Sequence, residues 1–184
     1  MEIIKTEIPD LLIIKPQIFE DERGYFFESY NHELFNNNGI TYNFIQDNES
    51  KSSRGVIRGL HYQLAPYSQT KLVRVIKGRV LDVAVDLRKG SPTFGKWHSV
   101  ELSEKNKLQF LVPRGFAHGF AVLEDDTIFS YKCDNLYNKE SERGINFNDK
   151  KLNIDWGFDL EKAIISVKDK TNPCFDDAEK NFIY

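Results

Sequence analysis

Apolar and polar positions alternate most regularly between Leu81 and Leu87. The odd positions of this segment are all apolar and the even positions are alanine or aspartate, which is typical of a half-buried strand. Other short segments are rich in β-branched and aromatic residues and end at Gly, Pro or Asp turn signals. The sequence therefore predicts strands over residues 3–8, 11–14, 24–30, 72–76, 81–87, 97–102, 108–112, 119–123 and 127–133, and an extended segment over 54–63.

Helical patterns are scarce in this chain. Asn31 is a candidate N-cap for a short helix over 31–35 that ends near Gly39, and residues 159–163 predict one further helical turn. Short strands at this spacing, separated by glycine and proline turns, predict an all-β sandwich or barrel. A double-sheet jelly roll is favoured because it is large enough to hold a ligand between its sheets, although other β-sandwiches stay open at this point.

Length and charge exclude several classes of protein. The chain has 184 residues and no linker-like tract, so we expect one domain over residues 1–184. Its formal net charge is -3 and its cations are dispersed, which argues against a nucleic-acid partner. No apolar run reaches the roughly 18 residues of a membrane span, and no signal pattern opens the sequence. We expect a cytoplasmic protein with no membrane partner.

The two cysteines, Cys133 and Cys174, are too few for a disulfide scaffold and lack the spacing of a metal site. We interpret them as free thiols in a reducing compartment, with a single disulfide as the alternative.

Two glycine-rich segments carry the most informative chemistry. The segment Arg54–Gln63 holds Arg58 and His61, and the segment Pro113–Phe120 holds His118 beside a further arginine. Histidine is suited to move a proton near neutral pH, and arginine offers a planar fork to an anion. Glycines let a backbone approach a ligand closely. These segments favour proton chemistry on an anionic metabolite, against the alternative of strands whose polar residues only face water.

Metal catalysis is the natural first alternative for a jelly roll. A mononuclear site of that kind uses two closely spaced histidines, a carboxylate and a later histidine. The chain has no His-x-His pair, and the position two after His61 is Gln63. Of the other histidines, His32 is expected at the surface and His98 has no chemical partner near it in the sequence. We therefore expect no metal and no other cofactor.

Metal-free proton abstraction next to a carbonyl is the second alternative. Two acid–base groups on opposite faces of one carbon can invert its configuration. His61 is the candidate base, and a tyrosine phenol such as Tyr131 suits the opposite acid. A carboxylate such as Asp169 would fix the tautomer of the histidine, but the residues alone do not select it from 28 acidic residues. A jelly-roll module that binds a nucleotide or a sugar without chemistry stays the alternative from another class.

Taken together, these segments resemble the dTDP-4-dehydrorhamnose 3,5-epimerase family of nucleotide-sugar epimerases in the cupin superfamily. The resemblance covers nearly the whole chain in order. Its segments are 21–28, 46–48, 54–63, 71–75, 82–88, 113–120, 131–132, 148–149 and 168–169.

The resemblance implies an all-β fold, a cupin-type double-stranded β-helix or jelly roll with a few short helices, working as a homodimer without a metal. It implies inversion at C3 and C5 of dTDP-4-dehydro-6-deoxy-D-glucose to give dTDP-4-dehydro-L-rhamnose, in dTDP-L-rhamnose biosynthesis. The alternative within the class is an epimerase of a dTDP-4-keto-6-deoxy sugar that inverts only one of these carbons.

The resemblance also assigns site residues. Those implied in catalysis are the base His61, its supporting carboxylate Asp169, the opposite-face acid Tyr131, and Lys71 near the C4 oxygen. Those implied in binding the substrate, some of them across the dimer, are Arg23, Phe26, Glu28, Gln46, Asn48, Arg58, His118, Tyr137 and Lys170.

Two features of the sequence depart from simple expectations, the first from strand alternation and the second from the pattern of the family. Strict alternation from Ile57 puts Arg58 and His61 on opposite faces of one strand, so we predict either a bulge at Gly59 or an arginine that reaches around the edge. In addition, Gly157 follows Trp156 where the family usually has proline, a change away from the proposed chemistry that puts the stiffness of this loop in doubt.

Overall fold

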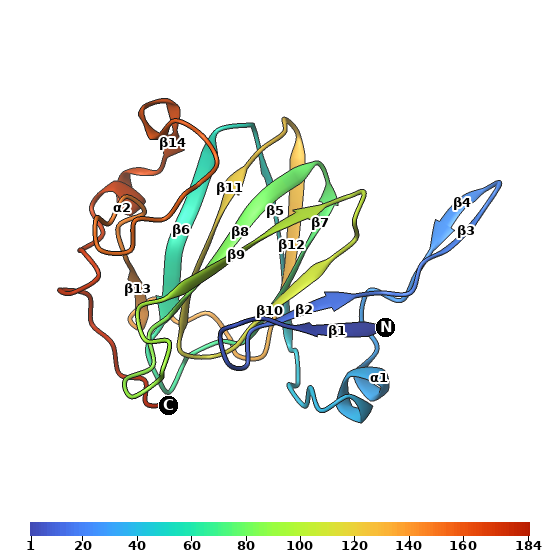
Figure 1. The fold of residues 1–184 in the computed structure, drawn as a ribbon, viewed down its shortest axis with the longest axis horizontal. Coiled ribbons are helices and arrows are strands. Elements are labelled where there is room, and N and C mark those ends of the chain that lie inside the picture. The colour runs from blue at the N-terminus through green and yellow to red at the C-terminus, as the bar shows by residue number, and fades with distance from the viewer.

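Two β-sheets face each other in the computed structural model, which describes residues 1–184 (Figure 1). The first sheet has the order β1 (Glu2–Lys5), β2 (Leu12–Lys15), β10 (Gln109–Val112), β7 (Lys71–Lys77), β12 (Thr127–Cys133) and β5 (Gln46–Ser52). The second has the order β13 (Glu142–Gly144), β6 (Val56–Gln63), β11 (Phe116–Val122), β8 (Arg79–Asp86) and β9 (Trp97–Ser103). The all-β class predicted from the sequence is confirmed.

Smaller elements surround this sandwich. A two-stranded arm, β3 (Phe19–Asp21) and β4 (Gly24–Phe26), projects away from the body (Figure 1). The helix α1 (His32–Asn37) follows the arm. Near the C-terminus lie the 3-10 helix η1 (Leu160–Lys162), the short strand β14 (Ile164–Ile165) and the one-turn helix α2 (Val167–Lys170). β14 pairs with β6 in parallel, so the chain after residue 163 is attached to the second sheet.

Three apolar clusters explain why the layers stay together. Between the sheets, side chains such as Val73 and Phe110 of the first sheet pack with Val80 and Phe120 of the second. The outer face of the second sheet is covered by the C-terminal chain, including Trp156. The outer face of the first sheet is covered by α1 and the segment that follows it. The second sheet is thus covered on both faces, and the first is covered on its outer face over β2, β10 and the start of β7.

This double covering corrects our interpretation of the segment 81–87. Its odd positions are apolar because they face the C-terminal layer, as Val83 and Val85 do. Its even positions do not face water, because Asp82, Ala84 and Asp86 are fully buried. The alternating pattern with aspartates predicted a solvent-exposed face, but these aspartates are hydrogen-bonded to side chains inside the protein.

Each predicted strand is found in the structure, but several are shorter than expected. The strand expected over 3–8 ends at Lys5, and the one expected over 24–30 ends at Phe26. The short helix expected at 31–35 is α1, and Asn31 caps it by accepting the N–H of Leu34 at 3.0 Å. The strand β5 was not expected, and neither were the short strands β3, β13 and β14.

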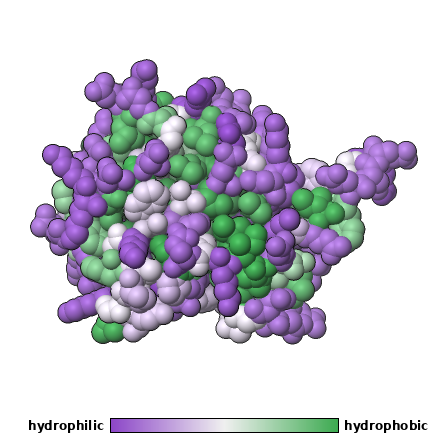
Figure 2. Space-filling model, in the orientation of Figure 1, coloured by the Kyte–Doolittle hydropathy of each residue, from purple (hydrophilic) through white to green (hydrophobic).

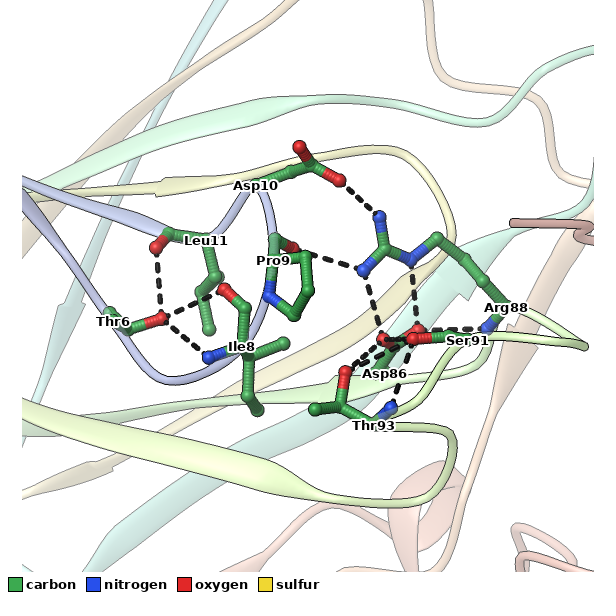
Figure 3. A network of polar contacts seen from close by, with 9 residues as sticks. All are labelled: Thr6, Ile8, Pro9, Asp10, Leu11, Asp86, Arg88, Ser91 and Thr93. Carbon is green, nitrogen blue, oxygen red and sulfur yellow. Dashed lines mark hydrogen bonds and ion pairs between the residues drawn. The ribbon is translucent and has the colours of Figure 1, made fainter.

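A buried ion pair fastens the end of β8 to the turn between β1 and β2 (Figure 3). Arg88 donates to both carboxylate oxygens of Asp86 at 2.9 Å, and its guanidinium also reaches Asp10 at 2.7 Å and the carbonyl of Pro9 at 3.0 Å. Burial pushes the pKa of Asp86 upward, but hydrogen bonds from Arg88, and from nearby hydroxyls such as that of Ser91, hold it below its ordinary value.

The arm carries exposed aromatic rings. Phe26 is 67% exposed, and Phe19 and Tyr25 are also exposed. Figure 2 shows apolar surface gathered between the sandwich and the base of the arm. Exposed apolar area of this kind marks interaction surfaces. The longest helix, α1, has six residues, so none of the helices could span a membrane.

Gly157 adopts a backbone φ of +76°. Proline holds φ near −65° and cannot take this conformation. The turn after Trp156 therefore differs from one built on proline, and the side chain of Asp155 stabilises it by accepting the N–H of Gly157 at 2.9 Å.

Candidate active site

A cavity of about 480 Å³ opens between the two sheets. This volume lies within the range of small-molecule sites. Six of the predicted site residues line it, namely Arg58, His61, Lys71, His118, Tyr131 and Asp169. The sequence segments 54–63, 71–75, 113–120, 131–132 and 168–169 therefore meet at one place in the fold.

His61 and Asp169 form a hydrogen-bonded pair at this cavity. The Nε2 atom of His61 lies 2.6 Å from Oδ1 of Asp169. The histidine side chain is 32% exposed, whereas the carboxylate is 4% exposed. An ionised Asp169 accepts the Nε2–H, which leaves the lone pair on Nδ1 free to take a proton from a ligand.

The short helix α2 places Asp169 for this contact. Ser166 caps the helix by accepting the N–H of Asp169 at 3.0 Å, and the other oxygen of the carboxylate accepts the N–H of Gly59 at 3.4 Å. Burial raises the pKa of Asp169, but its interaction with His61, together with hydrogen bonds from the N–H of Gly59 and from Ser166, holds the pKa below its ordinary value. Asp169 is therefore ionised at neutral pH.

A bulge in β6 brings Arg58 and His61 to the same cavity. Along β11, His118 pairs with His61 and Phe120 pairs with Arg58, so two residues of β6, Gly59 and Leu60, lie opposite the single residue Gly119 of β11. Gly59 lies at the irregularity with φ +135°, and an added Cβ there would meet the Cα of Gly119 at 2.5 Å. The bulge predicted at Gly59 is confirmed, and glycine is required by both the backbone angle and the close approach.

Tyr131 and Lys71 face the cavity from the opposite sheet. They belong to neighbouring strands, β12 and β7, and Nζ of Lys71 lies 5.9 Å from the centre of the Tyr131 ring. Burial raises the pKa of Tyr131, so its phenol keeps its proton at neutral pH. Burial lowers the pKa of Lys71 because it disfavours the charged ammonium.

His118 forms a second buried histidine–aspartate pair. Its Nε2 lies 2.8 Å from Oδ1 of Asp82, and its ring stacks on Phe129. Burial raises the pKa of Asp82, against the opposing effect of His118. Asp82 was not among the predicted site residues. Its signal in the sequence was an acidic position inside a strand of apolar residues, which we interpreted as solvent-facing.

The strand β5 forms a polar wall beside the cavity. Its alternate residues Gln46, Asn48, Ser50 and Ser52 pair with Cys133, Tyr131, Phe129 and Thr127 of β12. Ser50 lines the cavity, and Ser52 accepts a hydrogen bond from Arg58 at 3.1 Å. Asn48 reaches the thiol of Cys133 at 3.7 Å and accepts from Gln46 at 3.0 Å.

Other predicted residues lie at the rim or away from the cavity. Tyr137 is 56% exposed at the end of the sandwich near Gln46, and Lys170 is exposed on α2. Arg23, Phe26 and Glu28 lie on or just after the arm and do not line this cavity within one chain. Arg23 instead pairs with Asp21 at 2.6 Å.

Glu142 of β13 was missed from the sequence. One of its oxygens accepts the hydroxyl of Tyr137 at 2.9 Å and the ammonium of Lys168 at 2.5 Å. Lys168 itself lines the cavity next to Asp169. A single glutamate at the end of a loop carries no sequence pattern that predicts its contacts with two segments of the site.

The remaining candidates for chemistry are outside the site. His32 is exposed, as expected, whereas His98 does have a partner, because its Nδ1 lies 2.7 Å from a carboxylate oxygen of Glu7. Cys133 and Cys174 are free thiols. Burial raises the pKa of Cys133 to about 11, so this thiol is unreactive at neutral pH. The structure holds no group of three or more histidine, cysteine or acidic side chains placed to bind a metal.

Comparison with known proteins gives a consistent result. The family model described as dTDP-4-dehydrorhamnose 3,5-epimerase matches residues 5–177. A protein of that name from Shigella flexneri is 54% identical over 180 residues, which are 97% of this chain and 98% of the relative.

Solved structures agree. The dTDP-4-dehydrorhamnose 3,5-epimerase of Elizabethkingia anophelis has a TM-score of 0.91 at 56% identity, covering 96% of this chain and 97% of that one. The dTDP-6-deoxy-D-glucose-3,5-epimerase of Legionella pneumophila, in complex with dTDP-4-keto-L-rhamnose, has a TM-score of 0.91 at 49% identity and covers 95% and 93%.

A 3'-monoepimerase from Streptomyces bikiniensis, in complex with dTDP-quinovose, is more distant, with 32% identity, a TM-score of 0.86 and coverage of 92% and 85%. The predicted cupin-type jelly roll is confirmed by this set of structures. With a matching family model and relatives at this identity over nearly its full length, the chain belongs to the dTDP-4-dehydrorhamnose 3,5-epimerase family.

Proposed function

We propose that this enzyme inverts C3 and C5 of dTDP-4-dehydro-6-deoxy-D-glucose and so forms dTDP-4-dehydro-L-rhamnose for dTDP-L-rhamnose biosynthesis. Family membership supports the substrate class. The observation that carries the mechanism is the placement of His61 on one sheet and Tyr131 on the other, with one cavity between them. Inversion of a carbon needs a base on one face and an acid on the other, and this cavity offers both.

The reaction begins with proton removal from a carbon next to the C4 ketone. Nδ1 of His61 takes the proton, and the electron pair of the broken C–H bond moves onto the C4 oxygen as an enolate. The imidazolium that forms is stabilised by the ionised Asp169 at 2.6 Å. Lys71, as an ammonium, stabilises the negative oxygen from a fixed position, so little reorganisation accompanies the step.

The second half returns a proton to the opposite face. The enolate collapses, a new C–H bond forms with the proton of the Tyr131 phenol, and the C4 ketone is restored. The phenolate and the imidazolium then exchange protons with solvent, which resets both groups without any oxidant or reductant. C3 and C5 flank the same ketone, so the same pair of groups serves both carbons after the sugar shifts in the cavity.

The nucleotide extends from the sugar toward the rim. We assign its binding to Gln46 and Asn48 on β5, to Tyr137 and Lys170 at the rim, and to Arg58 and His118 around the sugar and the pyrophosphate. Binding energy from this remote part of the substrate holds the reacting sugar in place.

We propose that the enzyme works as a homodimer, and that Arg23, Phe26 and Glu28 complete the site of the partner. The arm projects from its own sandwich with a 67% exposed phenylalanine, and it does not reach the cavity of its own chain. A pocket completed across a dimer accounts for both features. We also propose that residues 1–184 form a single domain. A nucleotide-sugar substrate and two free thiols are both consistent with the reducing cytoplasm, so we place the enzyme there.

Proton NMR in deuterated water tests the reaction. Purified enzyme and dTDP-4-dehydro-6-deoxy-D-glucose should give deuterium at both C3 and C5. Deuterium at one carbon only would assign the chain to single-centre epimerases, and no exchange by folded, dTDP-binding protein would refute the reaction.

The dimer has its own test. Light scattering should give about twice the mass of 21.4 kDa for the wild type, whereas a chain with Phe26→Ser should lose affinity for the substrate. A monomeric wild type with full activity would contradict a shared site.

A further inference from the structure

Gln63 ends the strand that carries His61 and has no role in the chemistry described so far. It occupies the position two after the base, where a metal-binding cupin would have a second histidine. The side chain is buried, with 5% of the residue exposed. A buried amide must satisfy its hydrogen-bonding groups within the protein, so its partners indicate its role.

All partners of the Gln63 side chain are backbone atoms of two neighbouring loops. Its Nε2 donates to the carbonyl of Tyr67 at 2.6 Å and to the carbonyl of Leu136 at 3.2 Å. Its Oε1 accepts the N–H of Asn138 at 2.7 Å. Leu136 and Asn138 flank Tyr137, so Gln63 holds the chain on both sides of that residue.

The segment 135–138 depends on such side-chain contacts. None of its backbone groups forms a hydrogen bond with another backbone group. Apart from Gln63, the contacts to its backbone come from Gln69 at the carbonyl of Asn135, from Gln46 at the N–H of Tyr137, and from Asn135's own side chain. A loop held in this way changes its position readily when one contact is lost.

We infer that Gln63 is a positioning residue that holds Tyr137 at the rim of the cavity in the orientation that contacts substrate. The inference rests on the proposed function, in which Tyr137 binds the nucleotide end of the substrate. Gln63 acts through the backbone of residues 136–138 and does not touch the reacting carbons. Its loss therefore weakens substrate binding and leaves the chemical step intact.

The variant Gln63→Leu tests this role because leucine keeps most of the volume and removes every hydrogen bond. Loss of two or three net hydrogen bonds from a loop predicts about a tenfold rise in KM and in the Kd of dTDP measured by calorimetry. The value of kcat should stay within about twofold of wild type. A fall in kcat with unchanged KM, or an unchanged Kd for dTDP, would overturn the inference.

Asn106 provides a matched control. It also makes three hydrogen bonds to backbone atoms of its own loop, accepting from Ser103 and Leu108 and donating to Glu101. That loop does not line the active-site cavity. Asn106→Leu should lower the melting temperature and leave KM and the Kd of dTDP unchanged. If both variants raise KM alike, the effect of Gln63 is general loss of stability and the inference fails.

A double-mutant cycle with Tyr137→Leu gives the sharpest result. If Gln63 acts through Tyr137, the double variant should bind dTDP no more weakly than Tyr137→Leu alone. Additive losses would contradict a shared role. Should Gln63→Leu not fold, the isosteric Gln63→Glu keeps the acceptor for Asn138, loses both donors, and enters the same cycle with the same expectation.

Wild-type measurements separate this inference from the proposed function. If wild-type enzyme binds no dTDP and exchanges no proton at C3 or C5, the proposed function itself is wrong. If wild-type enzyme does both and the cycle is additive, only the role of Gln63 is refuted.

Discussion

Nε2 of His61 lies 2.6 Å from Oδ1 of Asp169, although 108 positions separate the two residues in the sequence. The strand β6 supplies the first and the one-turn helix α2 supplies the second. An isolated helix of four residues is unstable, so the position of Asp169 depends on contacts with the rest of the fold. The pairing of β14 with β6 and the Ser166 cap provide those contacts.

Replacing Asp169 with asparagine should test this pair most directly. Asp169→Asn keeps the shape but cannot stabilise the imidazolium and favours the wrong tautomer, so kcat should fall about 10³–10⁴-fold with a small change in KM. Steady-state kinetics on the folded variant measures this. A kcat within tenfold of wild type would show that His61 does not need the carboxylate.

Removing the phenol should separate the two halves of the reaction. Tyr131→Phe leaves His61 in place, so proton abstraction and its exchange with solvent should continue while net inversion falls about 10²–10⁴-fold. NMR in deuterated water reports exchange and inversion in one sample. Equal losses of both would rule out Tyr131 as the acid that acts after abstraction.

The decline of enzymatic activity at alkaline pH should reflect the loss of a proton from Lys71. Burial lowers the pKa of this lysine, so its ammonium loses a proton at a lower pH than a free lysine does. Activity that requires the ammonium should therefore fall as pH rises through that lowered value. The groups facing Lys71 include Tyr131, whose pKa is raised, so the phenol loses its proton only at higher pH.

The variant Lys71→Arg checks this assignment. A guanidinium keeps its charge at alkaline pH, so the alkaline decline in kcat/KM should move to higher pH even if the plateau is lower. An unmoved decline would mean that another group controls it.

The ion pair at the end of β8 should dominate the stability of its region. Arg88→Met leaves Asp86 as an uncompensated buried charge, and breaking such a pair costs about 3–5 kcal/mol of unfolding free energy. Arg79→Met, which removes two half-exposed pairs with Glu101 and Glu124, should cost about 1 kcal/mol or less. Denaturant unfolding of both variants measures the difference, and equal losses would contradict the importance of burial.

Acid pH should reduce the difference in unfolding free energy between the wild type and Arg88→Met. The pKa of Asp86 is held below its unfolded value, so its stabilising contribution is present above the unfolded pKa and is lost as pH falls through the folded pKa. The two unfolding free energies should therefore converge at acid pH. Parallel curves down to the lowest accessible pH would exclude Asp86 as the linked group.

The parts of the fold that the sequence predicted are those with an apolar pattern. The segment 81–87 and the aromatic segment 127–133 stand out because their side chains fill the core, and the corresponding strands β8 and β12 differ from prediction by one or two residues at most. The strand β5, with the sequence QDNESKS, has no apolar residue at all. It is held by its ladder with β12, and one of its faces is the polar wall of the site, which no apolar pattern can indicate.

The candidate site was predictable from local motifs only in part. Glycines beside His61 and His118 indicated a close approach. The parity of Arg58 and His61 predicted either a bulge at Gly59 or an arginine that reaches around the edge, and the structure contains the bulge. Asp82 and Glu142 were missed because their partners, His118 and Lys168, are distant in the sequence. Contacts of this kind depend on the packing of the sheets and leave no trace in local spacing.

The bulge in β6 makes the active site sensitive to insertions in this strand. Side chains along a strand alternate between two faces, and the extra residue at Gly59 is what brings Arg58 and His61 to the same face. One further residue inserted between them would send Arg58 into the C-terminal layer while His61 stays at the cavity. Libraries that vary this enzyme should therefore not lengthen residues 56–63, and natural relatives that keep the activity should carry no insertion between Arg58 and His61.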